Sequence, residues 1–528
     1  GATLMGDGSS TLTFNAYTGR GLVDTDVQVF ESSMTATGLR FVRPQWWGAL
    51  GDDSNDDSVP IQAAIAAVPQ AAGGTPQAEL GAGGTIYFSP GIYLCTTGIV
   101  NQGRKISFIG SSMDNTTLKK NANIDLIKVD SFVRWQTIEN MTLDGNSKTG
   151  TLLYLNTPNS FDGYRLRLKD NGGVASTITD AALYLEQSTG CRFQYLWLEA
   201  NTKSLYCNKS HGLSLDHFTQ GAGGSLSDDC EFISANHIRI SYWNLEGSAG
   251  VVQGGMTFSG GRGLTITNGV IEHTHDITPI TIGLTGVPVR NISIDELVIG
   301  NPSYQATSVP SILVQLSCQD ISIRNVDFGF STLGQNNAHT GGWINIAEVF
   351  NVTLSNIMAQ GMSGTQTATD MIVTSSVGPD YMILDNIYGE GNTANTMTLR
   401  ADNLLIRNSN FDITLNSNCT NVQLTNCTGT ITDSSLKATD ITNAVRTQIT
   451  DLTNANIKAL AATPIELVAA PGANKIIEFV SAYLFLDYGS EVLAEPSAPD
   501  DLAIEYDDGT GQQIATWDTT GFITSSAD

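Results

Sequence analysis

Two glutamates occupy equivalent positions in a repeated pattern of the sequence, and their spacing suits acid–base chemistry. Glu246 follows Tyr242 by four residues, and Glu272 follows Asn268 by the same interval. If Tyr242 and Asn268 mark the same turn in consecutive coils of a parallel stack, the carboxylates lie about 4.8 Å apart. Carboxylates about 5 Å apart suit a retaining glycosidase, whereas a two-coil separation near ~9.5 Å would suit inversion. We therefore predict that Glu246 and Glu272 are catalytic, with one kept protonated by repulsion from the other.

Other interpretations of the aligned glutamates stay open. The chain contains 52 acidic residues, so some align by chance and are simply solvated. The same two side chains would also suit a protein that contacts a sugar without cleaving it.

Residues near the glutamate pair are candidates for substrate binding. His273, His275 and Asp276 directly follow Glu272 in an expected loop, where the histidines either bind substrate and transfer protons or are simply exposed. Their spacing matches no metal-binding motif, so we predict neither a metal ion nor another cofactor.

A second group of candidates lies further along the chain. The segment 221–231 is expected to interrupt a coil and form one side of a groove. Sugar sites also need flat apolar faces, and neighbouring residues of a strand point to opposite sides, so either Tyr242 or Trp243 should be exposed. For Trp197, the sequence fits an exposed position in the groove and a buried position in the solenoid interior equally well. The predicted substrate-binding residues here are Asp228, Glu231, Trp243 and the more distant Asp327.

Composition and missing motifs exclude several classes of function. The net charge is −26 with no Lys/Arg-rich run, which argues against nucleic-acid binding. An acidic surface repels anionic polymers at long range, so an anionic glycan would have to be attracted by local groups in a groove. The chain lacks GxSxG, HExxH and P-loop motifs, which argues against serine hydrolases, zinc proteases and NTPases.

The seven cysteines are scattered and odd in number, which predicts reduced, mostly buried thiols. No apolar run is long enough to span a membrane, and no signal peptide opens the chain. Because the first residue is Gly, we expect that an N-terminal attachment domain is missing.

The elements that must position these residues are strands. Only 15% of residues are charged and 53 are glycine, which together with abundant Val, Ile, Thr, Asn and Ser predicts an all-β protein. Between residues 105 and 428, alternating apolar residues followed by a turn residue, usually Asn, recur with centres 18 to 31 residues apart. Such a period predicts a solenoid, in which turn asparagines stack amide on amide in a structural role. The clear copies are 264–268, 292–296, 321–325, 352–356, 382–386, 404–408 and 422–426, and weaker ones centre on Gly110, Asn140, Leu168, Trp197, His217 and Tyr242.

The segment before the repeats predicts a cap and then two strands. In GDDSNDDSVPIQAAIAAV (51–68), Asp57 or Ser58 can cap a short amphipathic helix over 58–68, with Pro60 in its first turn. GGTIYFSPGIYL (83–94) predicts two short strands around a Pro-Gly turn. This stretch resembles the start of the pectate-lyase-like β-helix family, apart from Ser89, where that family usually has proline. The resemblance implies a right-handed parallel β-helix plugged at its N-terminal end.

We expect three regions: a lead-in over 1–40, the parallel β-helix over 41–440, and a linker with a small β-sandwich over 441–528. In the third region, a helix-like spacing from Val445 to Ile457 precedes expected strands at 465–468, 475–480, 482–486 and 502–506. The stretch AATPIELVAAPG (461–472) resembles C-terminal modules of phage receptor-binding proteins.

The capped β-helix, acidic glycine-rich composition and C-terminal β-module resemble phage tailspikes that depolymerise capsules. The resemblance implies an endo-glycoside hydrolase that acts on bacterial capsular or O-antigen polysaccharide. It further implies a homotrimer, made in the host cytoplasm and attached to the virion tail or baseplate through the missing N-terminal region. A polysaccharide lyase using His273, His275 or Arg262 as the base, and a non-catalytic glycan-binding adhesin, are the alternatives.

Overall fold

The computed structural model divides the chain into two units, residues 1–444 and 445–528, which are described separately. It describes residues 11–13, 26–32, 34–70, 83–130, 134–173, 177–221, 229–246, 255–272, 278–284, 287–300, 310–329, 343–360, 370–375, 378–390, 396–416, 419, 421–429, 431–433, 450, 452–460, 463–467, 479, 481–482, 502–506 and 513–517.

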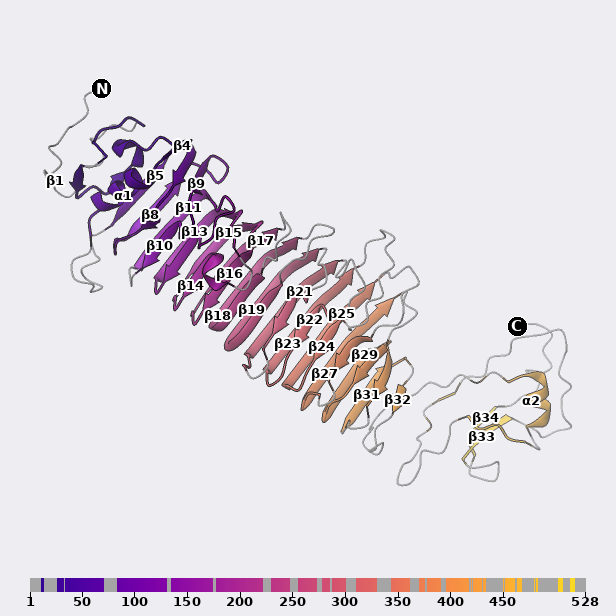
Figure 1. Cartoon of the computed structure of the whole chain (residues 1–528). Helices are drawn as coiled ribbons and strands as arrows, with labels where there is room; N and C mark the ends of the chain where they lie inside the picture. The colour runs from indigo at the N-terminus through magenta and orange to yellow at the C-terminus, as the bar shows by residue number, and fades with distance from the viewer. Residues whose placement is uncertain are drawn as a thin grey trace. The chain divides into compact units, whose positions relative to one another are not determined.

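The first unit is a parallel β-helix, as the sequence predicts, with coils stacked in succession along the unit (Figure 1). Each coil contributes one short strand to a sheet that we call the first wall. The strands of that wall are β7 (Ile99–Val100), β10 (Ile127–Asp130), β12 (Leu153–Asn156), β14 (Ala181–Glu186), β16 (Lys203–Asn208), the start of β18 (Asp229–Glu246) and of β19 (Met256–Glu272), β20 (Ile280–Ile282), β22 (Ile312–Val314), β24 (Ile344–Ile346), β26 (Asp370–Thr374), β28 (Thr396–Leu399), β30 (Asp412–Leu415) and β32 (Ile431–Asp433).

A second, longer strand in most coils bends and so serves two further walls. The bend is visible at β11 (Arg134–Asp144), whose two halves pair with separate strands, β8 (Ile106–Gly110) and β9 (Thr116–Lys120). Between the halves lies Asn140, with a φ of 56°. We call the wall before the bend the second wall and the one after it the third wall. The other bent strands are β13 (Asn159–Lys169), β15 (Arg192–Glu199), β17 (Ser214–Gly221), β18, β19, β21 (Arg290–Gly300), β23 (Gln319–Gly329), β25 (Phe350–Gln360), β27 (Tyr381–Glu390), β29 (Asn403–Ser409) and β31 (Val422–Cys427).

The predicted asparagines occupy the bends and form amide ladders. Asparagine tolerates the left-handed backbone conformation better than most residues. Asn356 Nδ2 donates to Asn325 Oδ1 at 2.8 Å, and Asn386 Nδ2 donates to Asn356 Oδ1 at 3.0 Å. Asn426 donates to Asn408 in the same way at 2.8 Å. The predicted structural role of these asparagines is confirmed.

Two of the weaker copies were placed wrongly along the chain. The bend residues of those coils are Arg165 (φ 52°) and Tyr195 (φ 55°), rather than Leu168 and Trp197. Leu168 lies in the buried interior. The error arose because alternating apolar residues continue past the bend, so periodicity alone does not locate it. Asn140, His217 and Tyr242 are bend residues, as predicted.

A helix and a pair of tryptophans close the N-terminal end of the coils. Helix α1 (Ser58–Ala67) lies where it was predicted, next to a 3₁₀ helix (Pro44–Trp47) whose two tryptophans are fully buried. Asp57 occupies the N-cap position, but its side chain does not cap the helix. Its carboxylate instead accepts backbone N–H groups of Leu50 and Gly51, which ties the preceding turn to the helix start.

Short strands surround this cap. The predicted pair around the Pro-Gly turn is confirmed as β5 and β6. The strands are β1 (Thr11–Thr13), β2 (Thr35–Thr37), β3 (Phe41–Val42), β4 (Asp52–Asp56), β5 (Gly84–Phe88) and β6 (Gly91–Cys95).

All seven cysteines are buried and free, as predicted. Burial raises the pKa of the Cys191 and Cys207 thiols to about 12, which keeps them protonated at neutral pH. Among the described residues, no helix has the length and apolar character needed to cross a membrane.

The second unit contains helix α2 (Asn454–Ala459) and an antiparallel pair, β33 (Leu502–Glu505) and β34 (Gln513–Trp517). The strand predicted at 465–468 is wrong for residues 465–467, which are not in a strand. The strands predicted at 475–480 and 482–486 lie almost entirely outside the described residues.

Candidate functional site

The two candidate catalytic glutamates end neighbouring strands. Glu246 is the last residue of β18, Glu272 is the last residue of β19, and their Cα atoms are partners in the parallel register. The backbone thus brings the two positions into adjacent coils, as their spacing predicts. Their side chains lie outside the described part of the structure, as do Asp228, His273, His275 and Asp276.

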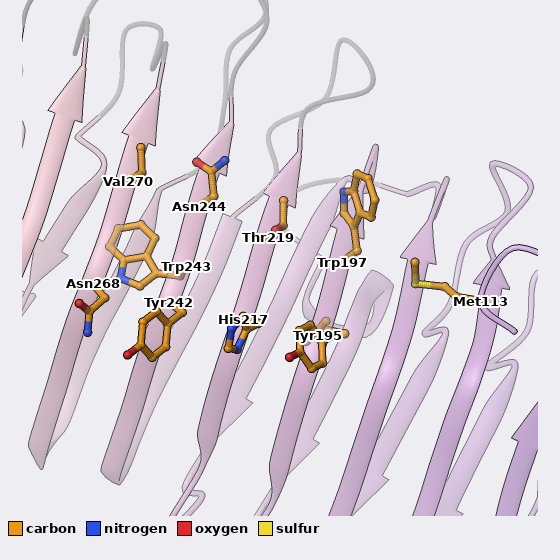
Figure 2. A pocket seen from close by; sticks show the side chains of 11 residues that line it. Met113, Tyr195, Trp197, His217, Thr219, Tyr242, Trp243, Asn244, Asn268 and Val270 are labelled. Carbon is orange, nitrogen blue, oxygen red and sulfur yellow. The ribbon is translucent and has the colours of Figure 1, made fainter.

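Four residues before the glutamate column, the bends carry aromatic rings instead of asparagine. Tyr195, His217 and Tyr242 succeed one another on β15, β17 and β18. The ring centroids of Tyr195 and His217 are 4.6 Å apart, and those of His217 and Tyr242 are 5.1 Å apart. All three side chains are exposed, Tyr242 to 57%. We call these three residues the aromatic ladder; Figure 2 shows their rings in a row across neighbouring strands.

The aromatic ladder borders a pocket of about 480 Å³ on the third wall. The second row of lining residues lies two positions beyond the ladder on each strand, in continuous register: Trp197, Thr219, Asn244 and Val270 (Figure 2). Trp197 is partly exposed, and the Arg167 guanidinium carbon lies 4.5 Å from its ring centroid. Trp197 therefore belongs to the outer wall rather than to the interior.

Tyr242, and not Trp243, is the exposed member of that pair. Trp243 is 2% exposed, and its indole Nε1 has no hydrogen-bond partner within the described part of the chain. The indole lies over Gly269, its register partner in the next coil, where an added Cβ would stand 2.2 Å from Cε2. Alternation along β18 directs the Trp243 ring inward, although Trp243 is among the residues that line the pocket. Its role in substrate binding stays a prediction.

A carboxylate supports the aromatic ladder from the second wall. Asp216 Oδ1 accepts from Ser241 at 3.0 Å and lies 3.4 Å from His217 Nδ1, while Oδ2 accepts from Gln194 at 3.1 Å. Burial raises the pKa of Asp216, but hydrogen bonds from Gln194 and Ser241 and the charge of His217 outweigh it, so the pKa lies below its usual value. The ionised Asp216 therefore holds His217 at the centre of the ladder.

The structure separates Glu231 from the other candidates. Glu231 lies on the first wall, where its carboxylate forms an ion pair with the buried Lys203 at 2.8 Å. The aromatic ladder and pocket are on the opposite side of two bends, so the structure places Glu231 away from the pocket, and its role in substrate binding stays a prediction. The early part of β18 belongs to a different wall from its end.

Asp327 is on the third wall, in the row of Val270 and Val298. Burial raises its pKa above the usual value, and its Oδ1 has no hydrogen-bond partner among the described residues. It lies two coils beyond the pocket. Its role in substrate binding stays a prediction.

Tyr242 and His217 were predicted as bend residues, but Tyr195 was not, and no role was predicted for the His217 ring. The available signal was the interval between the aromatic residues, 22 residues from 195 to 217 and 25 from 217 to 242, which falls within the period of the repeat. In the described residues, no three His, Cys, Asp or Glu side chains gather as metal ligands.

Comparisons with known proteins agree with the fold. Residues 45–228 match the family model for rhamnogalacturonase A/epimerase, pectate lyase-like. The chain thus carries a parallel β-helix whose first part is similar to the pectate-lyase-like family. The curated proteins include no match.

Several solved structures are similar to this chain at low identity. ORF18 of Geobacillus virus E2 is 15% identical, with 66% of this chain and 60% of that protein covered and a TM-score of 0.35. The A-module of mannuronan C-5 epimerase AlgE4 from Azotobacter vinelandii is 15% identical, covering 77% and 96% with a TM-score of 0.39. The N-terminal fragment of bacteriophage phi29 gene product 12 is 11% identical, covering 75% and 71% with a TM-score of 0.45. At this level of similarity they do not assign an activity.

Proposed function

We propose that this protein is a phage tailspike-type depolymerase that binds a bacterial surface polysaccharide across the third wall and hydrolyses its glycosidic bonds. One observation carries the proposal. An exposed aromatic ladder borders a pocket, and two glutamates end the strands of that pocket in adjacent coils. The match of residues 45–228 to a polysaccharide-active family supports the same substrate class.

The pocket has the chemistry that sugars require. The faces of sugar rings are apolar and pack on aromatic side chains, while hydroxyl groups need donors and acceptors. Tyr242 and Trp197 provide exposed or partly exposed rings, and Thr219, Asn244 and Asn268 provide polar groups beside them. The pocket also lies on the open outer surface of the solenoid. A polysaccharide can therefore bind there at any point along its length, without presenting a free end.

We assign the reaction to Glu246 and Glu272. The residues two positions before them, Asn244 and Val270, line the pocket, and the two-residue period of a strand predicts the same face for the glutamates. One carboxylic acid donates its proton to the glycosidic oxygen while the other carboxylate attacks the anomeric carbon. Water then releases the glycosyl-enzyme, giving its proton to the first glutamate. Adjacent coils lie about 4.8 Å apart, which favours this retaining course.

The test is to incubate the protein with purified capsular or O-antigen polysaccharide from candidate hosts. New reducing ends without ultraviolet-absorbing unsaturated sugars are expected. An ultraviolet-absorbing product would instead indicate a lyase, for which the exposed Arg262 is a candidate base. Binding without any cleavage would indicate an adhesin.

The variants Glu246→Gln and Glu272→Gln test the residues. Each is expected to lower kcat at least ~100-fold, because acid–base and nucleophilic steps contribute factors of that order. Glu390→Gln is the matched control: Glu390 ends β27, as Glu246 ends β18, on a distant coil of the same wall. Full activity in both test variants would remove the assignment.

We further propose that three chains assemble on the virion tail, as the tailspike resemblance implies. Light scattering of the purified protein is expected to give three chains per particle. A stable monomer at micromolar concentration would contradict the proposed trimer but would not bear on the proposed glycan site.

A further inference from the structure

A tryptophan, an arginine and a glutamate contact one another at one end of the pocket on the third wall. The Arg167 guanidinium carbon lies 4.5 Å from the ring centroid of Trp197, its register partner in the next coil. Arg167 Nε lies 3.7 Å from Glu199 Oε2, and Glu199 is two residues beyond Trp197 on β15. Figure 2 shows Trp197 in the part of the outer row that is remote from Val270. We call Arg167, Trp197 and Glu199 the tryptophan cluster.

The polar groups of the tryptophan cluster keep hydrogen-bonding capacity. Arg167 lies between two carboxylates, with its Nε 3.7 Å from Glu199 and its Nη1 3.8 Å from Asp114. Both separations are those of ion pairs and are too long for hydrogen bonds. The side chains of Arg167 and Glu199 are 24% and 38% exposed. The guanidinium group can therefore donate to a ligand, and the carboxylate can accept from one.

The next coil leaves room beside the indole. Trp197 pairs in register with Thr219, and Glu199 pairs with Gly221, so both residues on that side are small. Among the described residues, a Cβ added at Gly221 would meet only Trp197 Nε1, at 3.4 Å. A sugar ring that contacts Trp197 therefore has space over this strand.

The mixture of groups suits a neutral sugar better than an acidic one. The apolar face of a pyranose packs on an aromatic ring, and each hydroxyl group both donates and accepts hydrogen bonds. A guanidinium donor beside a carboxylate acceptor matches that double requirement. One guanidinium group, that of Arg167, faces two carboxylates, those of Glu199 and Asp114. The excess negative charge repels a carboxylate or phosphate on the sugar.

The tryptophan cluster is separate from the contact that we expect at Tyr242. The outer row runs in register from Trp197 through Thr219 to Asn244, which lies two residues beyond Tyr242. Trp197 is thus two coils away from the strand of Tyr242, about 10 Å across the wall. Sugars on the two rings are therefore different residues of a bound chain.

We infer that the tryptophan cluster is a subsite for a neutral pyranose residue, and that Glu199 selects this residue by accepting hydrogen bonds from its hydroxyl groups. The inference rests on the proposed function, because it names the class of sugar bound at one end of the same pocket.

The test measures binding of single sugars to the full chain by NMR titration, so that the linkages of a polymer play no part. The probes are the methyl glycosides of glucose, galactose and mannose, together with glucuronate and galacturonate. At least one neutral glycoside is expected to bind with a Kd on the order of 1 mM, and the uronates at least ~10-fold more weakly. The titrations are repeated with Tyr242→Ala, in which the neutral glycoside should still bind.

In the Tyr242→Ala background, Trp197→Ala and Glu199→Gln are each expected to weaken binding of the neutral glycoside about tenfold. Trp135→Ala and Glu296→Gln are the matched controls, because both positions are exposed bends on other coils, and they should bind like their parent. Thermal unfolding of each variant checks that it is folded. Trp197→Phe, which keeps an aromatic ring, replaces Trp197→Ala if the alanine variant does not fold, and should bind more tightly than a variant without a ring.

Uronates bound as tightly as the neutral glycosides would overturn the inference, as would unchanged binding in Glu199→Gln or no binding of any neutral glycoside. Binding is measured without turnover, so the two proposals fail separately. A protein that binds a neutral glycoside through Trp197 but cleaves no polysaccharide refutes the hydrolase and supports the subsite. Cleavage of a capsule by a protein that binds none of the glycosides does the reverse.

Discussion

The imidazole of His217 lies nearly parallel to the ring of Tyr242, with an angle of 20° between the planes and 5.1 Å between the centroids. In the next coil the bend residue is Asn268, so the stack of rings ends at Tyr242. Among the described residues, the last ring of the ladder therefore has no further aromatic neighbour on that side. Tyr242 lines the pocket, and we expect its ring to be the main apolar contact for a sugar.

Replacing Tyr242 by alanine is expected to weaken glycan binding about tenfold, because aromatic contacts contribute about 0.5–1.5 kcal/mol beyond their buried area. Calorimetric titration with oligosaccharide checks this. Tyr381→Ala is the control, since Tyr381 is exposed to 56%, nearly as much as Tyr242, on a distant coil. Equal affinity of the Tyr242 variant and wild type would remove the aromatic ladder from the binding site.

The amide ladder is expected to stabilise the solenoid through both hydrogen bonds and backbone conformation. Asn356→Ala loses the bonds to Asn325 and from Asn386, about 0.5–1.5 kcal/mol each, and places alanine at a φ of 53°, which costs roughly 1–2 kcal/mol. Thermal unfolding should show a clear drop in Tm. Asn356→Gly is the control, because glycine tolerates this φ but forms no side-chain hydrogen bond. Its Tm should therefore fall between those of wild type and Asn356→Ala. A Tm of Asn356→Gly no higher than that of Asn356→Ala would mean that the backbone conformation at this position contributes nothing to stability.

Gly269 is expected to tolerate no side chain while Trp243 is present. Gly269→Ala would bring a methyl group 2.2 Å from the indole Cε2, and overpacking of this kind costs about 1–3 kcal/mol. In a Trp243→Leu background the same change should cost much less, a coupling that a double-mutant cycle of unfolding free energies measures. Gly221→Ala is the control, because its nearest contact would be an ordinary 3.4 Å to Trp197 Nε1. Identical costs in both backgrounds would refute the steric explanation.

Asp216 is expected to make stability depend on pH in the acid range. Its pKa is lower in the folded protein than its usual value of 3.8, so the folded state binds this proton less tightly than the unfolded chain. The stabilisation is therefore fully present well above that value and is lost as pH falls below it, through the folded pKa. The gap in unfolding free energy between wild type and Asp216→Asn should shrink as pH falls below about 5. A gap that widens over this acid range would contradict the explanation.

The fold was predictable because its signals are local and repeated. Each clear copy of the pattern has an alternating strand and a bend asparagine, and the left-handed conformation at Asn325 or Asn408 is one that asparagine tolerates well. The cap helix was predictable from Pro60 and from apolar residues at helical spacing. Its N-cap was not, because the Asp57 carboxylate binds a preceding turn that no local pattern encodes.

The site was predictable only where the register was correct. Tyr242 and Asn268 were identified as bend residues, so the alignment of Glu246 with Glu272 followed. In the coils before them, the bends are at Arg165 and Tyr195, whereas the repeat was predicted to centre on Leu168 and Trp197, and the aromatic ladder therefore went unnoticed. Glu231 was misplaced because β18 passes along all three walls without a break, and sequence distance within one strand does not reveal the bends.

Each coil contributes one residue to the bend column and one to the neighbouring outer row, and it packs only on the coils before and after it. Recombination between related genes at coil boundaries therefore replaces a single rung of this surface and leaves the others in place. Under the proposed function, the protein can follow changes in a polysaccharide one rung at a time, without redesign of the interior that holds it together.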